Sequence, residues 1–589
     1  MNEMQRSIRF AVLTFIGFIS AGSASIVMAA GTHYIAANGS DTNDGASKTT
    51  PWAHAPGMTN CRANCSSYTP TAGDQFIFKG GDSWHYGNNS AVPYVGSGQW
   101  SWSWSGNSTH CDYARTDTST CIYIGVDRTW FSGNSWARPI FNGDNPVTNG
   151  FPSSCAYDEG ASGYFFLKIG SVSYLTVDDL EFTGKCWSNT VGGGSQSHGY
   201  ISLGGGATNV MVKNSYLHGW SATPSSADYH YNISTGTGAI ADYNQYAYDI
   251  IDGSDSSRAL NATQSAAYCL YVAQIGVSTA TNLCASGQGV YGKAYDVHGS
   301  IFRYLGNFMV STNTHTLHDN LFEYLYFTYS GVGSQQHPNI DNQVAQVSGQ
   351  TTLFYNNILR HTYVTEDIYL AVTTSAYVFN NVFYDNMNVP NFGIISAGCV
   401  RFNKVSNSNL TTSAYIFNNT IGDGNCQFNF DHANAPLTAW NGTAYFQNNH
   451  FIGFPSAQLS SVYSCQTTAT CTIVDNGNEV FQSAATAAAQ GYTAASNFAP
   501  TSFAGATVGA GANASSSCAT FSSDAALCSG TSDGAAYQPG SGGEVASYPA
   551  ISLVARPASG AWDAGAYFFG GGTTATKPNP PTALSATVQ

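Results

Sequence analysis

One short pattern recurs eight times between residues 177 and 452: polar residues, usually including Asn, followed by an apolar run. The copies read VDDLEF (177–182), VKNSYL (212–217), HGSIFR (298–303), HDNLFE (318–323), YNNILR (355–360), FNNVFY (379–384), FNNTIG (417–422) and QNNHFI (447–452). Their shared column is Asp179, Asn214, Ser300, Asn320, Asn357, Asn381, Asn419 and Asn449. Self-similarity of this kind is the signature of a repeat protein, in which each unit packs mainly on its neighbours.

The spacing of the copies indicates the kind of repeat. Successive column positions lie 20 residues apart between Ser300 and Asn320, and as many as 86 apart between Asn214 and Ser300. About twenty residues suit one coil of a three-sided solenoid, whereas a propeller blade needs roughly 40 to 45. Stacked Asn side chains can bond along the coil axis and satisfy backbone groups at tight corners. We therefore predict a solenoid of short strands with a structural Asn column.

Composition restricts the function of such a chain. Only 9% of the 589 residues are charged and 13% are aromatic, so the chain can bury a large core and should fold. The formal net charge of −15, without any run of Lys and Arg, excludes nucleic acid as a partner, because phosphate binding needs a basic surface. Repeat proteins grow by adding coils, so this length is compatible with one body.

Residues 1–30 are predicted to be a secretory signal peptide. Arg6 and Arg9 precede an apolar run over 10–21, and small residues follow up to Ala30. The apolar run is well short of the roughly 20 residues that a spanning helix needs, and no later segment could span a bilayer. We expect cleavage near Ala30 and a secreted protein, extracellular or periplasmic.

The cysteines support export. All 14 follow the signal segment, and they fall into seven sequential couples. The couples are Cys61/Cys65, Cys111/Cys121, Cys155/Cys186, Cys269/Cys284, Cys399/Cys426, Cys465/Cys471 and Cys518/Cys528. An even count in an exported chain indicates disulfides, and the doubled CxxC typical of a zinc site does not occur. We expect local disulfides that staple loops to a repetitive scaffold.

The two ends of the repeat region complete a family pattern. Residues 34–45 read YIAANGSDTNDG, and the closing segment carries ARP (555–557) and WDAGAY (562–567). With the repeated Asn-Asn-apolar steps, these segments resemble secreted right-handed parallel β-helix proteins of the pectate-lyase-like superfamily. The resemblance implies an all-β, right-handed parallel β-helix solenoid over 31–570, with disulfide-stapled loop insertions. An aromatic-rich insertion is expected over 218–297, and the Gly- and Pro-rich residues 571–589 are expected to form a flexible tail.

Residues at equal offsets from the column should lie about 4.8 Å apart on adjacent coils, so offsets can locate a site. Ionisable residues of this charge-poor chain gather between 296 and 367. The predicted catalytic residues are Arg303, His318, Glu323, Arg360, His361, Glu366 and Asp367. His298, His315, His337 and Tyr324 are predicted to contact substrate. The alternative for Arg303, Glu323 and Arg360 is a surface ion-pair ladder.

Two reactions suit these residues, and the resemblance implies a polysaccharide substrate for either. A glycoside hydrolase needs two carboxylates, one of them kept protonated, and Glu323, Glu366 and Asp367 are candidates. A polysaccharide lyase needs a base beside a uronate and a cation to hold its carboxylate, for which His318 or His361 with Arg303 or Arg360 would serve. A net charge of −15 repels polyuronates, so bound Ca²⁺ is a possible cofactor; no other is indicated.

Aromatic residues suggest glycan binding. Trp100, Trp102 and Trp104 alternate, so their rings can share one face of an extended segment, and sugar faces stack on such platforms. Trp102 and Trp104 are therefore predicted to bind substrate, with a buried aromatic row as the alternative. A non-catalytic carbohydrate-binding or adhesive β-helix is the rival to the enzyme.

Overall fold

The computed structural model describes residues 30–569, except 97–98, 115–118, 147–152, 158–163, 188–196, 223–228, 236–242, 254–286, 292–294, 306–307, 311–315, 326–339, 343–350, 364–365, 373–374, 388–397, 405–411, 423, 425, 432–440, 466–469 and 532–552. For part of several strands it describes the backbone alone. The predicted signal peptide, except for Ala30, and the predicted tail lie outside the described residues. In the described part, no helix is long and apolar enough to cross a membrane.

Three sides of a solenoid account for almost all the strands. The first sheet contains β1 (Thr32–Ile35), β2 (Gln75–Gly80), β5 (Ile122–Phe131), β8 (Ser173–Asp178), β12 (Thr208–Lys213), β16 (Gln245–Ala247), β19 (Asp296–His298), β22 (Thr316–His318), β25 (Thr351–Tyr355), β28 (Ser375–Phe379), β31 (Thr412–Phe417), β34 (Asn441–Gln447) and β37 (Thr470–Asp475). The second contains β3 (Ser83–His85), β6 (Ile140–Asn142), β9 (Glu181–Thr183), β13 (Tyr216–His218), β17 (Ile250–Asp252), β20 (Ile301–Leu305), β23 (Leu321–Leu325), β26 (Ile358–Tyr363), β29 (Val382–Met387), β32 (Thr420–Ile421), β35 (His450–Ile452) and β38 (Val480–Gln482).

The third side is divided into two sheets. One contains β4 (Trp100–Trp102), β7 (Phe165–Ile169), β11 (Ser197–Leu203), β15 (Tyr229–Thr235) and β18 (Gly287–Tyr291). The other contains β21 (Phe308–Val310), β24 (Ile340–Asn342), β27 (Glu366–Val372), β30 (Gly398–Lys404), β33 (Phe428–Asp431) and β36 (Tyr463–Cys465). The remaining elements are the pair β10 (Cys186–Trp187) and β14 (Ser221–Ala222), the pair β39 (Ser529–Thr531) and β40 (Leu553–Ala555), the helices α1 (Ala63–Ser67), α3 (Ala484–Ala489) and α4 (Cys518–Phe521), and single-turn 3₁₀ segments at Leu459–Ser461, Ala494–Ser496, Ser515–Ser517 and Ala526–Cys528.

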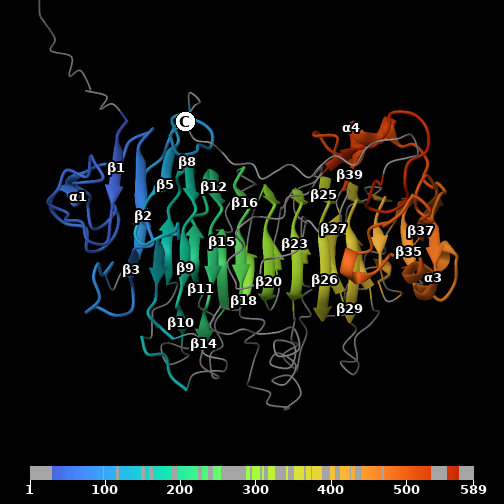
Figure 1. Cartoon of the computed structure of the whole chain (residues 1–589), viewed down its shortest axis with the longest axis horizontal. Coiled ribbons are helices and arrows are strands. Elements are labelled where there is room, and N and C mark those ends of the chain that lie inside the picture. The colour runs from blue at the N-terminus through green and yellow to red at the C-terminus, as the bar shows by residue number, and fades with distance from the viewer. Residues whose placement is uncertain are drawn as a thin grey trace, which may run out of the picture.

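Each coil visits the three sides in turn, as in the order β7, β8, β9, and the next coil pairs with it in parallel. All three sides are built from parallel pairs; the pair β39 and β40 is antiparallel. The coils succeed one another along the long axis of the molecule, from the blue end to the orange end (Figure 1). The predicted right-handed parallel β-helix is therefore confirmed.

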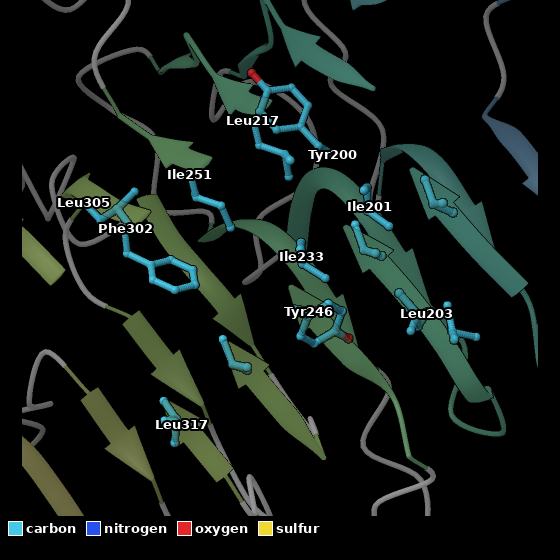
Figure 2. Packing of buried hydrophobic residues seen from close by; sticks show 14 of the residues in the cluster. Tyr200, Ile201, Leu203, Leu217, Ile233, Tyr246, Ile251, Phe302, Leu305 and Leu317 are labelled. Atoms are coloured by element: carbon cyan, nitrogen blue, oxygen red, sulfur yellow. The ribbon is translucent and has the colours of Figure 1, made fainter. Parts of the chain in front are cut away.

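Strand alternation builds the core. Because successive side chains of a strand point to opposite faces, the middle residue of each three-residue strand in the first and second sheets points inward. Ile251, Phe302 and Leu317 are at most 1% exposed and point into the interior (Figure 2). Like residues stack from coil to coil, as Phe302 does on Phe322 with 5.2 Å between ring centroids. The interior is a continuous apolar column along the axis.

The Asn column lies at the corner between the first and second sheets. Each side-chain carbonyl accepts from the backbone N–H one coil earlier, as in Asn320 N to Asn357 Oδ1 at 3.0 Å and Asn357 N to Asn381 Oδ1 at 3.0 Å. These side chains are 0% exposed. The structural role predicted for the column is confirmed from Ser300 to Asn449.

The predicted column is one residue out of register at its start. Ser215 and Asp249 occupy the equivalent positions, because Ser215 N donates to Asp249 Oδ1 and Asp249 N donates to Ser300 Oγ. Asp179 and Asn214 instead have φ of 61° and 55°, like Asp319 on its own coil. The coil containing Asp249 carries no Asn pair, so the repeat search missed it. It lies within 218–297, where we expected an insertion.

The described disulfides follow the predicted couples. Cys61–Cys65, Cys111–Cys121, Cys155–Cys186, Cys465–Cys471 and Cys518–Cys528 are bonded. Cys426 is also disulfide-bonded. Cys269 and Cys284 lie outside the described residues.

The C-terminal segment forms a cover on the outer face of the first sheet. Phe521 of α4 and Trp562 pack with Tyr355, Phe379 and Phe417 in one buried cluster. α4 lies beside the coils at the orange end, away from the blue end (Figure 1). The cover therefore shields the later coils of this face.

Candidate functional site

A row of mostly polar side chains runs along the outer face of the first sheet, where successive strands end. The register sets Lys213, Ala247, His298, His318 and Tyr355 side by side on β12, β16, β19, β22 and β25. From Tyr355 onward the C-terminal cover buries the row. His298 and His318 precede that cover and remain partly exposed, so ligands can approach them.

Five residues form what we call the His/Asp patch: Tyr248, Asp296, His298, His318 and Asp319. Asp296 bridges the two imidazoles, with Oδ2 2.9 Å from His298 Nδ1 and Oδ1 3.3 Å from His318 Nε2. His318 Nδ1 lies 2.7 Å from Asp319 Oδ2. The two imidazole rings stack with centroids 4.9 Å apart. The four ionisable groups are 16–27% exposed, which leaves them accessible at their edges.

His318 and Asp296 stabilise each other's charged form. Burial by itself would lower the pKa of His318, but hydrogen bonds to Asp296 and Asp319 and their negative charges outweigh it and raise this pKa to about 10. Burial would raise the pKa of Asp296, but its hydrogen bonds to His298 and His318 hold this pKa well below its usual range. His318 is therefore an imidazolium and Asp296 a carboxylate at neutral pH.

Tyr248 forms one wall of the patch. The side chain is 42% exposed, and its ring meets His298 edge-on with centroids 5.1 Å apart. A Cβ on Gly299 would lie 2.5 Å from this ring, and φ of Gly299 is +62°, so glycine is required beneath it. Burial, with the charges of Asp319 and Asp296, raises the pKa of the Tyr248 phenol, which therefore stays protonated at neutral pH.

Lys213 supplies a cation two coils away from His298 in the same row. Its ammonium lies 3.7 Å from Asp178 Oδ2 and also contacts Asp112. Only 14% of its side chain is exposed. The row thus presents Lys213 and the His318 imidazolium about three strand spacings apart, roughly 14 Å, along the axis.

A second charged row lies on the outer face of the second sheet. Arg303, Glu323 and Arg360 are adjacent in register, as their equal offsets predicted, and Asp252 on the coil before them extends the row. Arg303 Nε donates to Asp252 at 2.7 Å, and Arg360 Nε to Glu323 at 2.8 Å. The four residues are 0–6% exposed. They form a buried ion-pair ladder on a different sheet from His318, and a polysaccharide would not reach Glu323 in this conformation.

His361 follows Arg360 and forms a separate pair with Asp385. His361 Nδ1 is hydrogen-bonded to Asp385 Oδ2, and the two side chains are 28% and 46% exposed. Both residues have left-handed backbones, with φ of 54° and 53°. The ring of His361 meets Tyr384 edge-on at 5.8 Å. With Glu366 and Asp367 on β27, the predicted catalytic residues therefore divide among three sheets instead of meeting at one point.

The other predicted residues are placed as follows. Glu366 and Asp367 begin β27 on the third side, and Tyr324 lies in β23; for these three the backbone alone is described. His315 and His337 lie outside the described residues. Trp102 is 1% exposed in the core, and Trp104 packs partly buried against it at 5.0 Å. Trp102 faces inward because Trp100 and Trp102 share the inner face of β4, so it offers no open ring to a sugar.

In the sequence, Asp296 and Asp319 lie within the cluster of ionisable residues and Tyr248 within the aromatic-rich insertion, but none of the three is among the predicted site residues, and Lys213 belongs to neither group. Asp296 and His298 stand two apart on one strand, so alternation could have paired them. The coil containing Tyr248 was hidden because Asp249 replaces the Asn that defines the repeat. Tyr248 could have been found from the apolar pattern Tyr-Ala-Tyr-Asp-Ile-Ile at 246–251.

The comparisons with known proteins do not assign an activity to this chain. No family model and no curated protein matches the chain. Similar solved structures include a lacto-N-biosidase from Eubacterium ramulus (11% identity, 77% of this chain and 68% of that chain, TM-score 0.32). A pectate lyase (13%, 91% and 96%, TM-score 0.33) and a rhamnogalacturonan lyase (13%, 76% and 87%, TM-score 0.32) are also similar. At these identities and TM-scores the matches assign nothing to the site.

Proposed function

We propose that the chain is a secreted enzyme that cleaves an acidic polysaccharide by β-elimination at the His/Asp patch. The observation that carries the proposal is the patch itself: two stacked imidazoles bridged by a carboxylate, with an exposed phenol against one of them. Its axial row would let an extended glycan lie along the coils. The disulfides support an oxidising compartment, and so export.

The groups of the patch match the proton transfers of an elimination. A base removes the proton beside the uronate carboxylate, the bond to the neighbouring sugar oxygen breaks, a carbon–carbon double bond forms, and the leaving oxygen takes a proton. In the neutral tautomer that donates its Nδ1 proton to Asp296, His298 would offer the electron pair of Nε2 as the base. Tyr248 is protonated beside it and can act as the acid.

Cations beside the base would bind the substrate carboxylate. His318 carries a positive charge and lies next to His298, and Lys213 lies two coils away. These charges would offset the repulsion between a polyuronate and a chain of net charge −15. Hydrolysis fits the patch less well, because it requires a protonated carboxyl group, and Asp296 is held ionised.

Single substitutions test this assignment. We expect Tyr248→Phe and His298→Ala to reduce the release of unsaturated uronate from a panel of acidic polysaccharides by at least about 100-fold. Tyr243→Phe is the matched control, because Tyr243 is 56% exposed five residues earlier and packs against Tyr295. Wild-type rates in both patch variants would remove the patch from the reaction. Binding without cleavage by the wild-type chain would favour the adhesive alternative.

A further inference from the structure

Three side chains of the His/Asp patch are arranged as metal ligands. Asp296, His298 and His318 each offer one ligand atom, and these atoms lie within 4.8 Å of one another. We propose that they bind a divalent transition-metal ion of the Zn²⁺ type. The proposal goes beyond β-elimination and does not rest on it, because it uses the geometry of the side chains alone.

One pair of possible ligand atoms already has the spacing that an ion requires. Two donors at about 2.1 Å from a tetrahedral Zn²⁺ are about 3.4 Å apart. Asp296 Oδ1 and His318 Nε2 are 3.3 Å apart. His298 lies on the same face of β19 as Asp296, and its Nδ1 is 2.9 Å from Asp296 Oδ2, so its ring lies beside the same carboxylate.

An unsatisfied oxygen is the second observation that points to a cation. Asp296 Oδ1 is buried, and its close neighbour His318 Nε2 lies 3.3 Å away without good hydrogen-bond geometry, although buried polar atoms nearly always have a well-placed partner. It faces the Nε2 atom of His318. An ion bound between these two atoms would replace the Nε2 proton of His318 and would bond directly to this oxygen.

Asp319 would orient the histidine ligand. Its Oδ2 lies 2.7 Å from His318 Nδ1, which directs Nε2 toward Asp296. Metal-bound histidines usually donate their other N–H to a carboxylate in this way. Asp319 is therefore a positioning residue in the proposed site and not a ligand.

The donor set selects the kind of ion. Two imidazole nitrogens and one carboxylate oxygen suit Zn²⁺ and its first-row neighbours. Ca²⁺, which we considered from the sequence, prefers six to eight oxygen ligands and does not match this set. An ion on His298 would also occupy the group proposed as base, so Zn²⁺ should inhibit elimination by the metal-free protein.

The direct test is equilibrium dialysis of the mature chain, without a polyhistidine tag and stripped with a chelator, against Zn²⁺. We expect about one ion per chain, and no such ion in Asp296→Ala or His318→Ala. Asp319→Asn should weaken binding by about 10- to 100-fold. His361→Ala is the matched control, because it removes an exposed histidine paired with an aspartate on the second sheet.

A Co²⁺ titration followed by visible absorption provides a second readout. Ligand-field bands should develop in the wild-type protein and in His361→Ala, and should be lost in His298→Gln, which removes an imidazole while retaining a polar side chain. Absence of Zn²⁺ binding, or binding unchanged in both Asp296→Ala and His298→Gln, would overturn the proposal. Neither result would bear on elimination, which is measured separately in the metal-free protein.

Discussion

Removal of one side chain from the Asn column should destabilise the solenoid locally. In Asn357→Ala, the backbone N–H of Asn320 loses its acceptor at 3.0 Å, and the carbonyl of Leu317 loses a donor at 3.0 Å. The Asn320 amide keeps its bond to the carbonyl of Val297 at 2.9 Å, which limits the damage. Each buried group left without a partner costs roughly 1–3 kcal/mol, so two affected groups suggest a loss of about 3 kcal/mol.

Hydrogen exchange followed by mass spectrometry can measure this loss coil by coil. In a solenoid each coil contacts its neighbours, so the effect should be confined to peptides that cover β22, β25 and β28. A loss of about 3 kcal/mol corresponds to exchange about 100-fold faster at these strands. Peptides from β2 and β5 should exchange at the wild-type rate.

The control is Asn107→Ala, since Asn107 is an exposed loop residue. We expect its effect to stay within about 0.5 kcal/mol. Hydrogen exchange that is less than about threefold faster around β25 in Asn357→Ala would refute the claim that the Asn column stabilises the corner. Equally faster exchange in both variants would refute it too.

Three further outcomes are expected. Burial lowers the pKa of His450 from 6.5 to about 4, so the unfolded chain binds more protons than the folded chain between these pH values. The free energy of unfolding should therefore fall by up to about 3 kcal/mol as the pH drops through this window. Urea unfolding of His450→Gln should not show this loss. Glu323→Gln should destabilise the fold by about 3–5 kcal/mol, because the buried charge of Arg360 loses its partner. Asp385→Asn, which removes an exposed partner of His361, should change the melting temperature little. Equal melting temperatures of the two variants would contradict the buried ion-pair ladder. Arg556→Met should loosen the C-terminal cover, because Arg556 Nη2 donates to Asn380 Oδ1 at 2.9 Å and the guanidinium lies over Trp562. Limited proteolysis should then cut residues 511–531 faster than in the wild-type protein. Cleavage at the wild-type rate would contradict this.

The repeat pattern predicted the architecture because each coil repeats the same corner. Asn320, Asn357 and Asn381 recur at that corner, and their offsets placed Arg303 beside Glu323 and His298 beside His318. Ser215 and Asp249 perform the same bonding with different side chains, so an Asn-based alignment slipped there by one residue. Residues of different types can accept the same hydrogen bond at one position of the coil. A search for a repeated residue type does not detect this equivalence.

The burial of the ion-pair ladder on the second sheet could not be predicted from the repeats. Arg360 is closed off partly by Asn497, whose side chain it contacts at 3.0 Å across 137 residues of sequence. The offset rule establishes which side chains are neighbours on a face, but a distant segment decides whether that face is open. The same reasoning explains why His318 is accessible, whereas Tyr355, the next residue of its row, is covered.

The most direct test of elimination at the His/Asp patch is the mass of the oligosaccharides released from an acidic polysaccharide by the metal-free protein. Elimination adds no water, so each new non-reducing end should carry an unsaturated uronate and weigh one water less than a hydrolysis product. We predict these unsaturated products from the wild-type chain and from Tyr243→Phe, and none from Tyr248→Phe. Saturated products, or unsaturated products that persist in Tyr248→Phe and His298→Ala, would contradict the account.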